Sequence, residues 1–210
     1  MGAFDWFWKA MGAQSERNDK KSKAVVDAAD SAVEDIAALS DSAVASSARE
    51  CVKDGAIADK STFLAALAVA SERKLGMRPF NVQSQAVLRL LEGDVIQMAT
   101  GEGKTLVGAM AATGFALQGK RVHLITVNNY LAARDAEWMR PLVEFFGLTV
   151  AAVTESSTRE ERVSAYRSDV IYAPVTEIGF DHLRDNQITS RDQTVQLPAD
   201  VALVDEADSV

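Results

Sequence analysis

The chain has 210 residues, 48% of them apolar, so it can bury a sizeable core, and we expect one domain with an appendage. Its net charge of −8 gives no overall electrostatic reason to bind nucleic acid, its single cysteine excludes an internal disulfide, and its two histidines argue against a zinc site. No apolar run approaches the ~20 residues of a membrane-spanning helix and no secretion signal is recognisable, so the composition predicts a cytoplasmic protein.

Residues 1–23 predict an aromatic amphipathic segment followed by a linker. Four large apolar side chains fall on one helical face near the start: Phe4, Phe7, Trp8 and Met11. Two interpretations stay open, because such a face either docks on a protein surface or enters a membrane interface, where tryptophan is favoured. Four basic residues that follow are compatible with an anionic lipid partner: Arg17, Lys20, Lys21 and Lys23. The polar run over 15–23 is typical of a linker.

Residues 24–75 predict a helical region. Apolar residues recur at helical spacing among acidic ones: Val25, Ala29, Val33, Ile36 and Leu39. The pattern breaks near Ser40 and Asp41, where either side chain can cap a second helix. A third helix is expected over about 61–75, and Gly76 ends it.

Residues 76–91 predict a turn and a further helix. Pro79 stops the preceding helix, Asn81 is expected to cap the next one, and Gln83 lies in its first turn. The Gln83 amide offers both a donor and an acceptor, which is what the edge of adenine requires, and Met77 and Phe80 would line the ring. The alternative, an exposed helix residue without a ligand, stays open.

Residues 95–107 have the order of a phosphate-binding loop. An apolar run predicts a buried strand, two glycines a loop, and residues 104–117 an apolar helix whose N-terminus favours phosphate. Lys104 would reach the β and γ phosphates, and the Thr105 hydroxyl would hold Mg²⁺. Met98 stands where the strict pattern has glycine. The alternative is an ordinary strand-to-helix turn.

Strands and helices alternate over residues 121–204. We expect strands at 121–127, 148–153, 169–173 and 201–204, a helix at 129–146, and a short helix at 159–167 capped by Thr158. Six residues of the 129–146 helix are expected to face the core: Tyr130, Leu131, Trp138, Leu142, Phe145 and Phe146. His123 is expected to be a core or edge histidine. This alternation predicts an α/β fold, with a parallel sheet covered by helices.

Acidic residues follow the last predicted strand. Such residues lie at the carboxyl end of the sheet, where ligands of these folds bind. Asp205 would serve Mg²⁺, Glu206 would polarise the attacking water, and Asp208 would bond to neighbouring segments. Acidic residues are also common in turns after strands, which is the alternative.

Four segments together resemble SecA, the ATPase motor of bacterial preprotein export. They are Met-Arg-Pro-Phe-Asn-Val-Gln at 77–83, Met-Ala-Thr-Gly-Glu-Gly-Lys-Thr at 98–105, Thr-Val-Asn-Asn-Tyr-Leu-Ala-Ala-Arg-Asp-Ala-Glu-Trp-Met at 126–139 and Gly-Phe-Asp-His-Leu-Arg-Asp-Asn at 179–186. The resemblance runs from about residue 75 onward and is weak over the first fifty residues. Asn129, His182 and Ala207 replace the usual Asp, Tyr and Val, and these departures favour the accessory, second SecA of some bacteria.

The resemblance implies a RecA-like P-loop NTPase domain over 76–210 that uses ATP and Mg²⁺. It assigns catalysis to Lys104, Asp205 and Glu206, the metal to Thr105 and Asp205 partly through water, and the nucleotide to Met77, Phe80, Gln83, Thr100, Gly101, Glu102, Gly103, Lys104 and Thr105. In this family a preprotein-binding domain and a second nucleotide-binding domain follow. The isolated chain is therefore expected to hold nucleotide weakly at best and to be inactive alone.

The resemblance also implies partners and a location. We expect a SecYEG-type channel, preproteins, peripheral attachment to the cytoplasmic face of the membrane, and a homodimer as one arrangement. Nucleic acid is not expected.

Two rival functions remain open. Asp-Glu-Ala-Asp at 205–208 is also the signature of RNA helicases, although residues 126–139 lack the Pro-Thr-Arg-Glu-Leu order of those enzymes. The other rival is a non-catalytic binding domain.

Overall fold

The computed structural model describes the backbone of residues 3–190 and 193–209, and the side chains of the same ranges from residue 20 onward. The side chains of the predicted aromatic stripe therefore lie outside the described residues. In chain order the elements are α1 (Ala3–Ala37), α2 (Asp41–Glu50), β1 (Val52–Lys53), β2 (Ala56–Ile57), α3 (Lys60–Leu75), α4 (Asn81–Leu91), α5 (Lys104–Leu117), β3 (Val122–Thr126), α6 (Asn129–Phe145), β4 (Val150–Ala152), α7 (Arg159–Ala165), β5 (Val170–Pro174), α8 (Val175–Asp185) and β6 (Val201–Val204).

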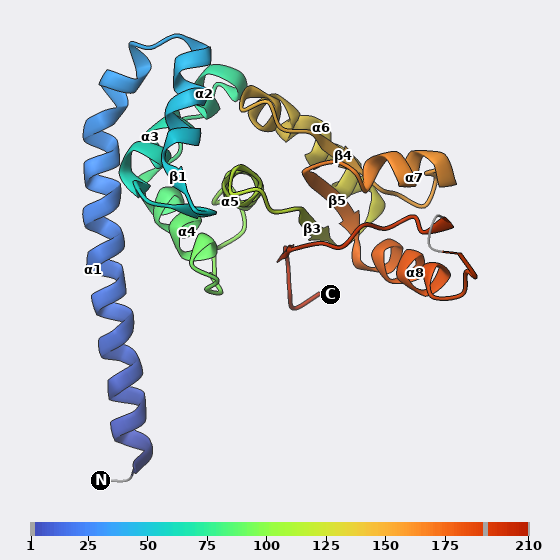
Figure 1. Ribbon diagram of the computed structural model, residues 1–210. Helices are drawn as coiled ribbons and strands as arrows, with labels where there is room; N and C mark the ends of the chain where they lie inside the picture. The colour runs from blue at the N-terminus through green and yellow to red at the C-terminus, as the bar shows by residue number, and fades with distance from the viewer. Residues whose placement is uncertain (1–2, 191–192, 210) are drawn as a thin grey trace.

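Helix α1 is one long helix along the edge of the molecule (Figure 1). The linker predicted over 15–23 was wrong, because this stretch is rich in Glu, Arg and Lys, which favour helix, and holds no glycine or proline to interrupt one. The buried face of α1 carries Val26, Ala29, Val33 and Ile36 and packs mainly on α3. Val25 is only partly buried and Leu39 is exposed, so the burial of both ends of the predicted apolar stripe differs from the prediction.

The predicted helix ends in this region are largely confirmed. Ser40 caps α2 by accepting from the Ala43 N–H at 3.3 Å, and Gly76 ends α3 with a left-handed φ of 67°. The expected cap at Asn81 was wrong. Phe80 occupies that position, and the Gln83 side chain accepts its N–H at 2.9 Å.

A β1–β2 hairpin between α2 and α3 had not been predicted. Its turn is Asp54-Gly55, with φ of 51° and 73°, a dipeptide that favours two-residue hairpin turns. Each strand has only two residues, too short for a periodic hydrophobic pattern to reveal it.

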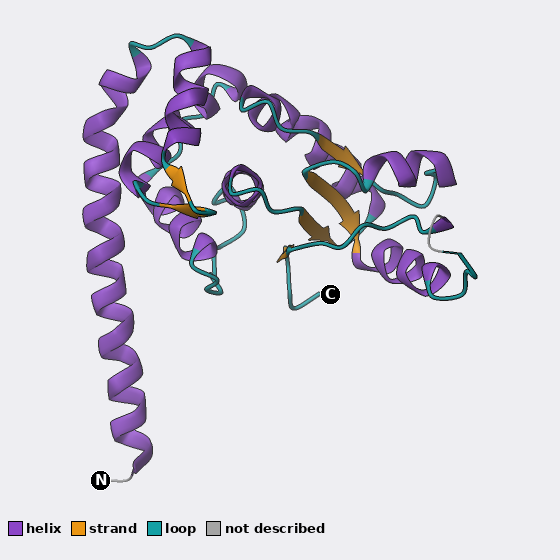
Figure 2. Ribbon diagram, in the orientation of Figure 1, coloured by secondary structure: helices purple, strands orange, loops and turns teal. Residues whose placement is uncertain are grey.

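The main sheet is parallel, in the order β4-β5-β3-β6, which confirms the predicted fold class and the strands at its centre. Figure 2 separates this sheet from the small hairpin among the N-terminal helices. Asn128 caps α6 and Thr158 caps α7, through bonds to the Leu131 and Glu161 N–H groups. Helix α8 follows β5 directly and had not been assigned from the sequence.

One apolar core joins the helical region to the sheet domain. It contains Val33 of α1, Phe63 of α3, Val87 of α4, Met110 of α5 and Met139 of α6, all at most 5% exposed. A second cluster beside it packs α5 and α6 onto β3 and β5. The N-terminal helices are therefore part of the support of α5, the helix that follows the predicted phosphate-binding loop.

Two predictions of burial were wrong. Residues 95–98 are not a strand, and Val95 is 96% exposed, because no described strand pairs with this run and β6 pairs with β3 alone. On α6, Tyr130 and Trp138 are 71% and 49% exposed. The small residues Ala132 and Ala136 face the sheet instead, since they allow α6 to approach it closely.

Candidate nucleotide-binding site

The loop before α5 has the conformation that its glycines permit. Gly101 and Gly103 have φ of 87° and 81°, in the left-handed region that glycine adopts without strain. The Glu102 side chain accepts the Ala99 N–H at 2.7 Å and closes the turn. Lys104 is the first residue of α5, and the first turn of a helix leaves N–H groups without helical partners. The loop therefore offers donors to an anion at the positive end of a helix.

Gln83 ties the start of α4 to this loop. Its Nε2 donates to the Glu102 carbonyl at 2.8 Å, while its Oε1 accepts the Phe80 N–H. A Cβ on Gly103 would lie 2.4 Å from this Nε2, so a larger residue there would have to displace the Gln83 side chain. Phe80 is 74% exposed, whereas Met77 is partly buried against the core. Recognition of adenine by these residues stays a prediction, with the Gln83 amide already bonded to the loop.

The carboxylates lie at the end of β6. The Asp205 N–H donates to the Ile125 carbonyl at 2.9 Å, which fixes the chain where the strand ends. Asp205 is half-buried and Glu206 is exposed. Glu206 has a φ of 55°, a strained conformation for a residue with a side chain, and such strain concentrates at functional sites.

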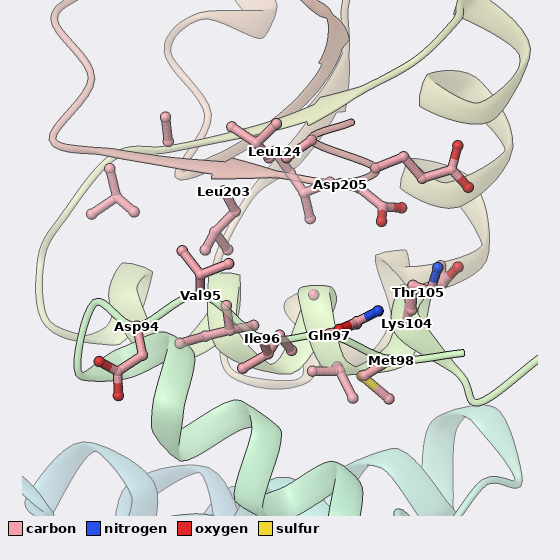
Figure 3. Close-up of a pocket in the computed structure, with 18 of the residues that line it drawn as sticks. Asp94, Val95, Ile96, Gln97, Met98, Lys104, Thr105, Leu124, Leu203 and Asp205 are labelled. Atoms are coloured by element: carbon pink, nitrogen blue, oxygen red, sulfur yellow. The ribbon is translucent and has the colours of Figure 1, made fainter. Parts of the chain in front are cut away.

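A cavity of about 780 Å³ brings the two segments together. Lys104 and Thr105 line it from α5, and Asp205 and Glu206 line it from the end of β6 (Figure 3). Its other end is apolar, with Val95 and Ile96 across from Leu203 and Leu124. The other residues predicted to bind nucleotide do not line this cavity. Four belong to the adjoining loop: Thr100, Gly101, Glu102 and Gly103. Three belong to the segment around the start of α4: Met77, Phe80 and Gln83.

Two buried polar residues of the cavity had no role in the sequence interpretation. Asp135 of α6 is 4% exposed, and Tyr172 of β5 is 1% exposed with no hydrogen-bond partner for its hydroxyl. Burial raises the pKa of the Asp135 carboxyl; Arg134 opposes this shift and Asp205 adds to it. Burial, and then the charges of Asp135 and Asp205, raise the pKa of Tyr172. The available signal was a carboxylate on the apolar face of a helix, between Ala132 and Ala136.

The oxygen groups at the polar end of the cavity fit a magnesium ion. Thr105, Asp205 and Asp135 present hydroxyl and carboxylate oxygens, and Tyr172 adds an unsatisfied buried hydroxyl. Among the described residues no group of three acidic, histidine or cysteine side chains is arranged as a complete metal cage. Mg²⁺ does not need one, because it keeps several waters and binds through one or two carboxylates together with phosphates.

None of the described helices combines the length and the apolar character that crossing a membrane requires.

A family model for the SecA DEAD-like domain matches residues 7–210. Proteins named protein translocase subunit SecA 2 are 63% identical in Corynebacterium efficiens and 60% in Corynebacterium glutamicum strain R, over all of this chain. A protein of the same name in Mycolicibacterium smegmatis is 51% identical over 97% of the chain. The chain spans 28%, 28% and 26% of the lengths of these relatives.

These similarities confirm the resemblance drawn from the motifs, including its second-SecA form, since all three relatives bear that name. The matching model is that of the SecA DEAD-like domain and not of RNA helicases, although the Asp-Glu-Ala-Asp sequence of this chain is also the helicase signature. On the match of residues 7–210, the chain belongs to the SecA DEAD-like domain family.

Proposed function

We propose that this chain forms the first nucleotide-binding part of an ATP-hydrolysing motor that drives preproteins across the bacterial cytoplasmic membrane. The observation that carries the proposal is the shared cavity in which Lys104 and Thr105 meet Asp205 and Glu206. The name of the relatives, protein translocase subunit SecA 2, supports protein translocation as the function of the motor. Residues 76–210 would be the nucleotide-binding domain, 24–75 its helical support and 1–23 the N-terminal segment.

Each residue of the cavity has a distinct part in the proposed reaction. Backbone N–H groups of residues 101–105 bind phosphate oxygens, and Lys104 places a positive charge on the outer phosphates. Thr105 and Asp205 hold Mg²⁺, which when bound neutralises charge that develops on the transferred phosphoryl group. Glu206 orients the attacking water and accepts its proton.

The adenine end of the site is proposed around Gln83. The Gln83 amide keeps one N–H beyond its bond to Glu102, and the exposed Phe80 ring is free to stack on a base. Met77 would complete this wall. Because Gln83 is hydrogen-bonded to the loop, binding of a base at Gln83 would also restrict the motion of the predicted phosphate-binding loop.

The partners proposed are a SecYEG-type channel and unfolded preproteins, with peripheral attachment to the cytoplasmic face of the membrane. Anionic lipid is proposed as the attachment surface for the basic residues that follow the aromatic stripe. A homodimer is proposed as one assembly, and nucleic acid is not among the partners.

The test is ATP turnover by the complete gene product, with unfolded preprotein and anionic vesicles in one reaction and single-stranded RNA in another. We expect stimulation by preprotein and lipid, none by RNA, and loss of turnover in Lys104→Ala. The matched control is Lys120→Ala, a lysine after α5 and outside the cavity lining, which should turn over normally. Stimulation by RNA alone would overturn the proposal in favour of a helicase.

A further inference from the structure

Tyr172 lines the cavity but has no role in the proposed reaction. It lies in the middle of β5, opposite Leu124 of β3, which in turn lies opposite Leu203 of β6. Partners in adjacent parallel strands point to the same face, and residues two apart along a strand do so as well. Tyr172 and Asp205 therefore face the same side of the sheet, and both line the cavity.

The Tyr172 hydroxyl is buried, and no described residue accepts a hydrogen bond from it. The residue is 1% exposed, and its ring packs in the same core cluster as Ala132 and Ala136 of α6. An unsatisfied buried hydroxyl costs about 1–3 kcal/mol, so a native protein keeps one where a ligand or ordered water completes it. The unsatisfied Tyr172 hydroxyl therefore indicates that a group bound in the cavity accepts its hydrogen bond.

Asp135 is the second buried polar group of the cavity. It lies on α6 between Ala132 and Ala136, the two alanines that share the Tyr172 cluster, and is 4% exposed. Its Oδ1 is held by Arg134, with distances of 2.7 Å to Nε and 2.6 Å to Nη2. This contact fixes the carboxylate and leaves Oδ2 to accept a further hydrogen bond.

A hydrated divalent cation at Asp205 satisfies both groups. Water bound to Mg²⁺ is a strong donor and requires acceptors, whereas a metal-binding carboxylate requires a donor on its other oxygen. A buried carboxylate and a buried hydroxyl in one cavity meet these two requirements. A phosphate would suit the hydroxyl but would be repelled by Asp135.

We propose that Tyr172 and Asp135 position the divalent cation of the site: the Tyr172 hydroxyl donates to the Asp205 carboxylate, and the Asp135 carboxylate accepts from a metal-bound water. This role rests on the proposed nucleotide site and makes both residues positioning residues rather than metal ligands. Residues that orient metal ligands in this way typically change metal affinity by about 10–100-fold when they are altered.

The experiment measures the binding of a fluorescent ADP derivative to the complete gene product while Mg²⁺ is titrated from zero. In Tyr172→Phe we expect unchanged ADP affinity in EDTA, but about a tenfold higher Mg²⁺ concentration for half of the Mg²⁺-dependent gain in affinity. Asp135→Asn, which keeps the shape of the side chain, should raise the same concentration.

Tyr166→Phe is the matched control, because Tyr166 is also a fully buried tyrosine but donates to Asp181 at 2.9 Å, outside the cavity lining. It should leave the Mg²⁺ dependence unchanged. A Tyr172→Phe half-point within twofold of wild type, or an equal shift in Tyr166→Phe, would overturn the inference. Absence of ADP binding by the wild-type complete gene product, at any Mg²⁺ concentration, would instead overturn the nucleotide site itself.

Discussion

Gly103 joins the phosphate loop to α5 and lies against Gln83. Its φ of 81° and the 2.4 Å between Gln83 Nε2 and the place that a Cβ would take are separate constraints, one on the backbone and one on space. Gly101 has the first constraint without the second, since a Cβ there meets nothing within 4 Å. The two glycines therefore allow backbone strain and side-chain crowding to be measured separately.

We predict that Gly101→Ala lowers the free energy of unfolding by about 1–2 kcal/mol, the cost of a left-handed residue with a Cβ. Gly103→Ala should cost about 1 kcal/mol more, because the displaced Gln83 loses its bond to Glu102. Urea unfolding of both variants measures the difference. Equal losses would show that Gln83 moves aside without cost.

Cys51 ends α2 as a buried thiol that donates to the Ser47 carbonyl. Burial raises the pKa of this thiol to about 11, with the charges of Asp59 and Glu50 adding to the shift. Only the thiolate reacts with alkylating reagents, so the reactive fraction at pH 8 is on the order of one in a thousand.

We predict that the rate of Cys51 alkylation in the folded chain is slow at pH 8 and keeps rising about tenfold per pH unit up to pH 10. The same reaction in urea should level off above about pH 9, since an unburied thiol has a pKa near 8.5. A folded-state rate that also levels off near pH 9 would mean that the thiol is not held in its buried position.

Helices α7 and α8 are held together by a buried charged network. Arg162 donates to Asp181 at 2.8 Å and to Glu177 at 2.7 Å, and all three side chains are nearly inaccessible. Tyr166 donates to the same Asp181, and Gln196, shortly before β6, donates to Tyr166 and to the Ile178 carbonyl. The network therefore links the 179–186 segment to the stretch of chain that leads into β6.

We predict that Arg162→Met lowers the free energy of unfolding by about 3–5 kcal/mol, because the buried Glu177 loses its counter-charge and the buried Asp181 keeps only that of the exposed Arg184. The control is Lys23→Met, whose partner Asp27 is an exposed i,i+4 neighbour, with an expected effect below about 0.5 kcal/mol. Chemical unfolding at pH 7 compares them. A loss below about 1 kcal/mol in Arg162→Met would show that the carboxylates take up protons or water instead.

The helical region and the sheet domain share one core, so we expect the described chain to unfold as one unit. Val33 of α1 is 5% exposed in the same cluster as Met110 of α5. When several helices share one hydrophobic cluster, a loss of packing at one residue destabilises every helix of the cluster.

We predict that Val33→Asp costs about 3 kcal/mol or more and lowers hydrogen-exchange protection in α5 as well as in α1, because an unpaired charge enters the shared core. Asp35→Asn, on the exposed face of α1, should leave both helices protected as in wild type. Loss of protection confined to α1 would show that the two regions unfold independently.

Much of the fold could be predicted from local patterns. The α5 helix and the β6 strand have the bounds that the sequence predicted, because each is an apolar run whose limits are visible in the adjacent residues. The predictions failed where burial depends on a distant partner. The run at 95–98 has the composition of a strand but lies across the cavity from β6 without pairing, and small alanines rather than aromatic residues bring α6 close to the sheet.

The sequence by itself was enough to predict four candidate site residues, because each belongs to a short segment whose chemistry can be recognised locally: Lys104, Thr105, Asp205 and Glu206. Only the tertiary structure decided that these residues share a cavity with Asp135 and Tyr172. Those two come from α6 and β5; the chain marks Asp135 only as a carboxylate on an apolar helix face, and it does not mark Tyr172. Their significance arises from burial and from unsatisfied hydrogen bonding, which are properties of the packed molecule.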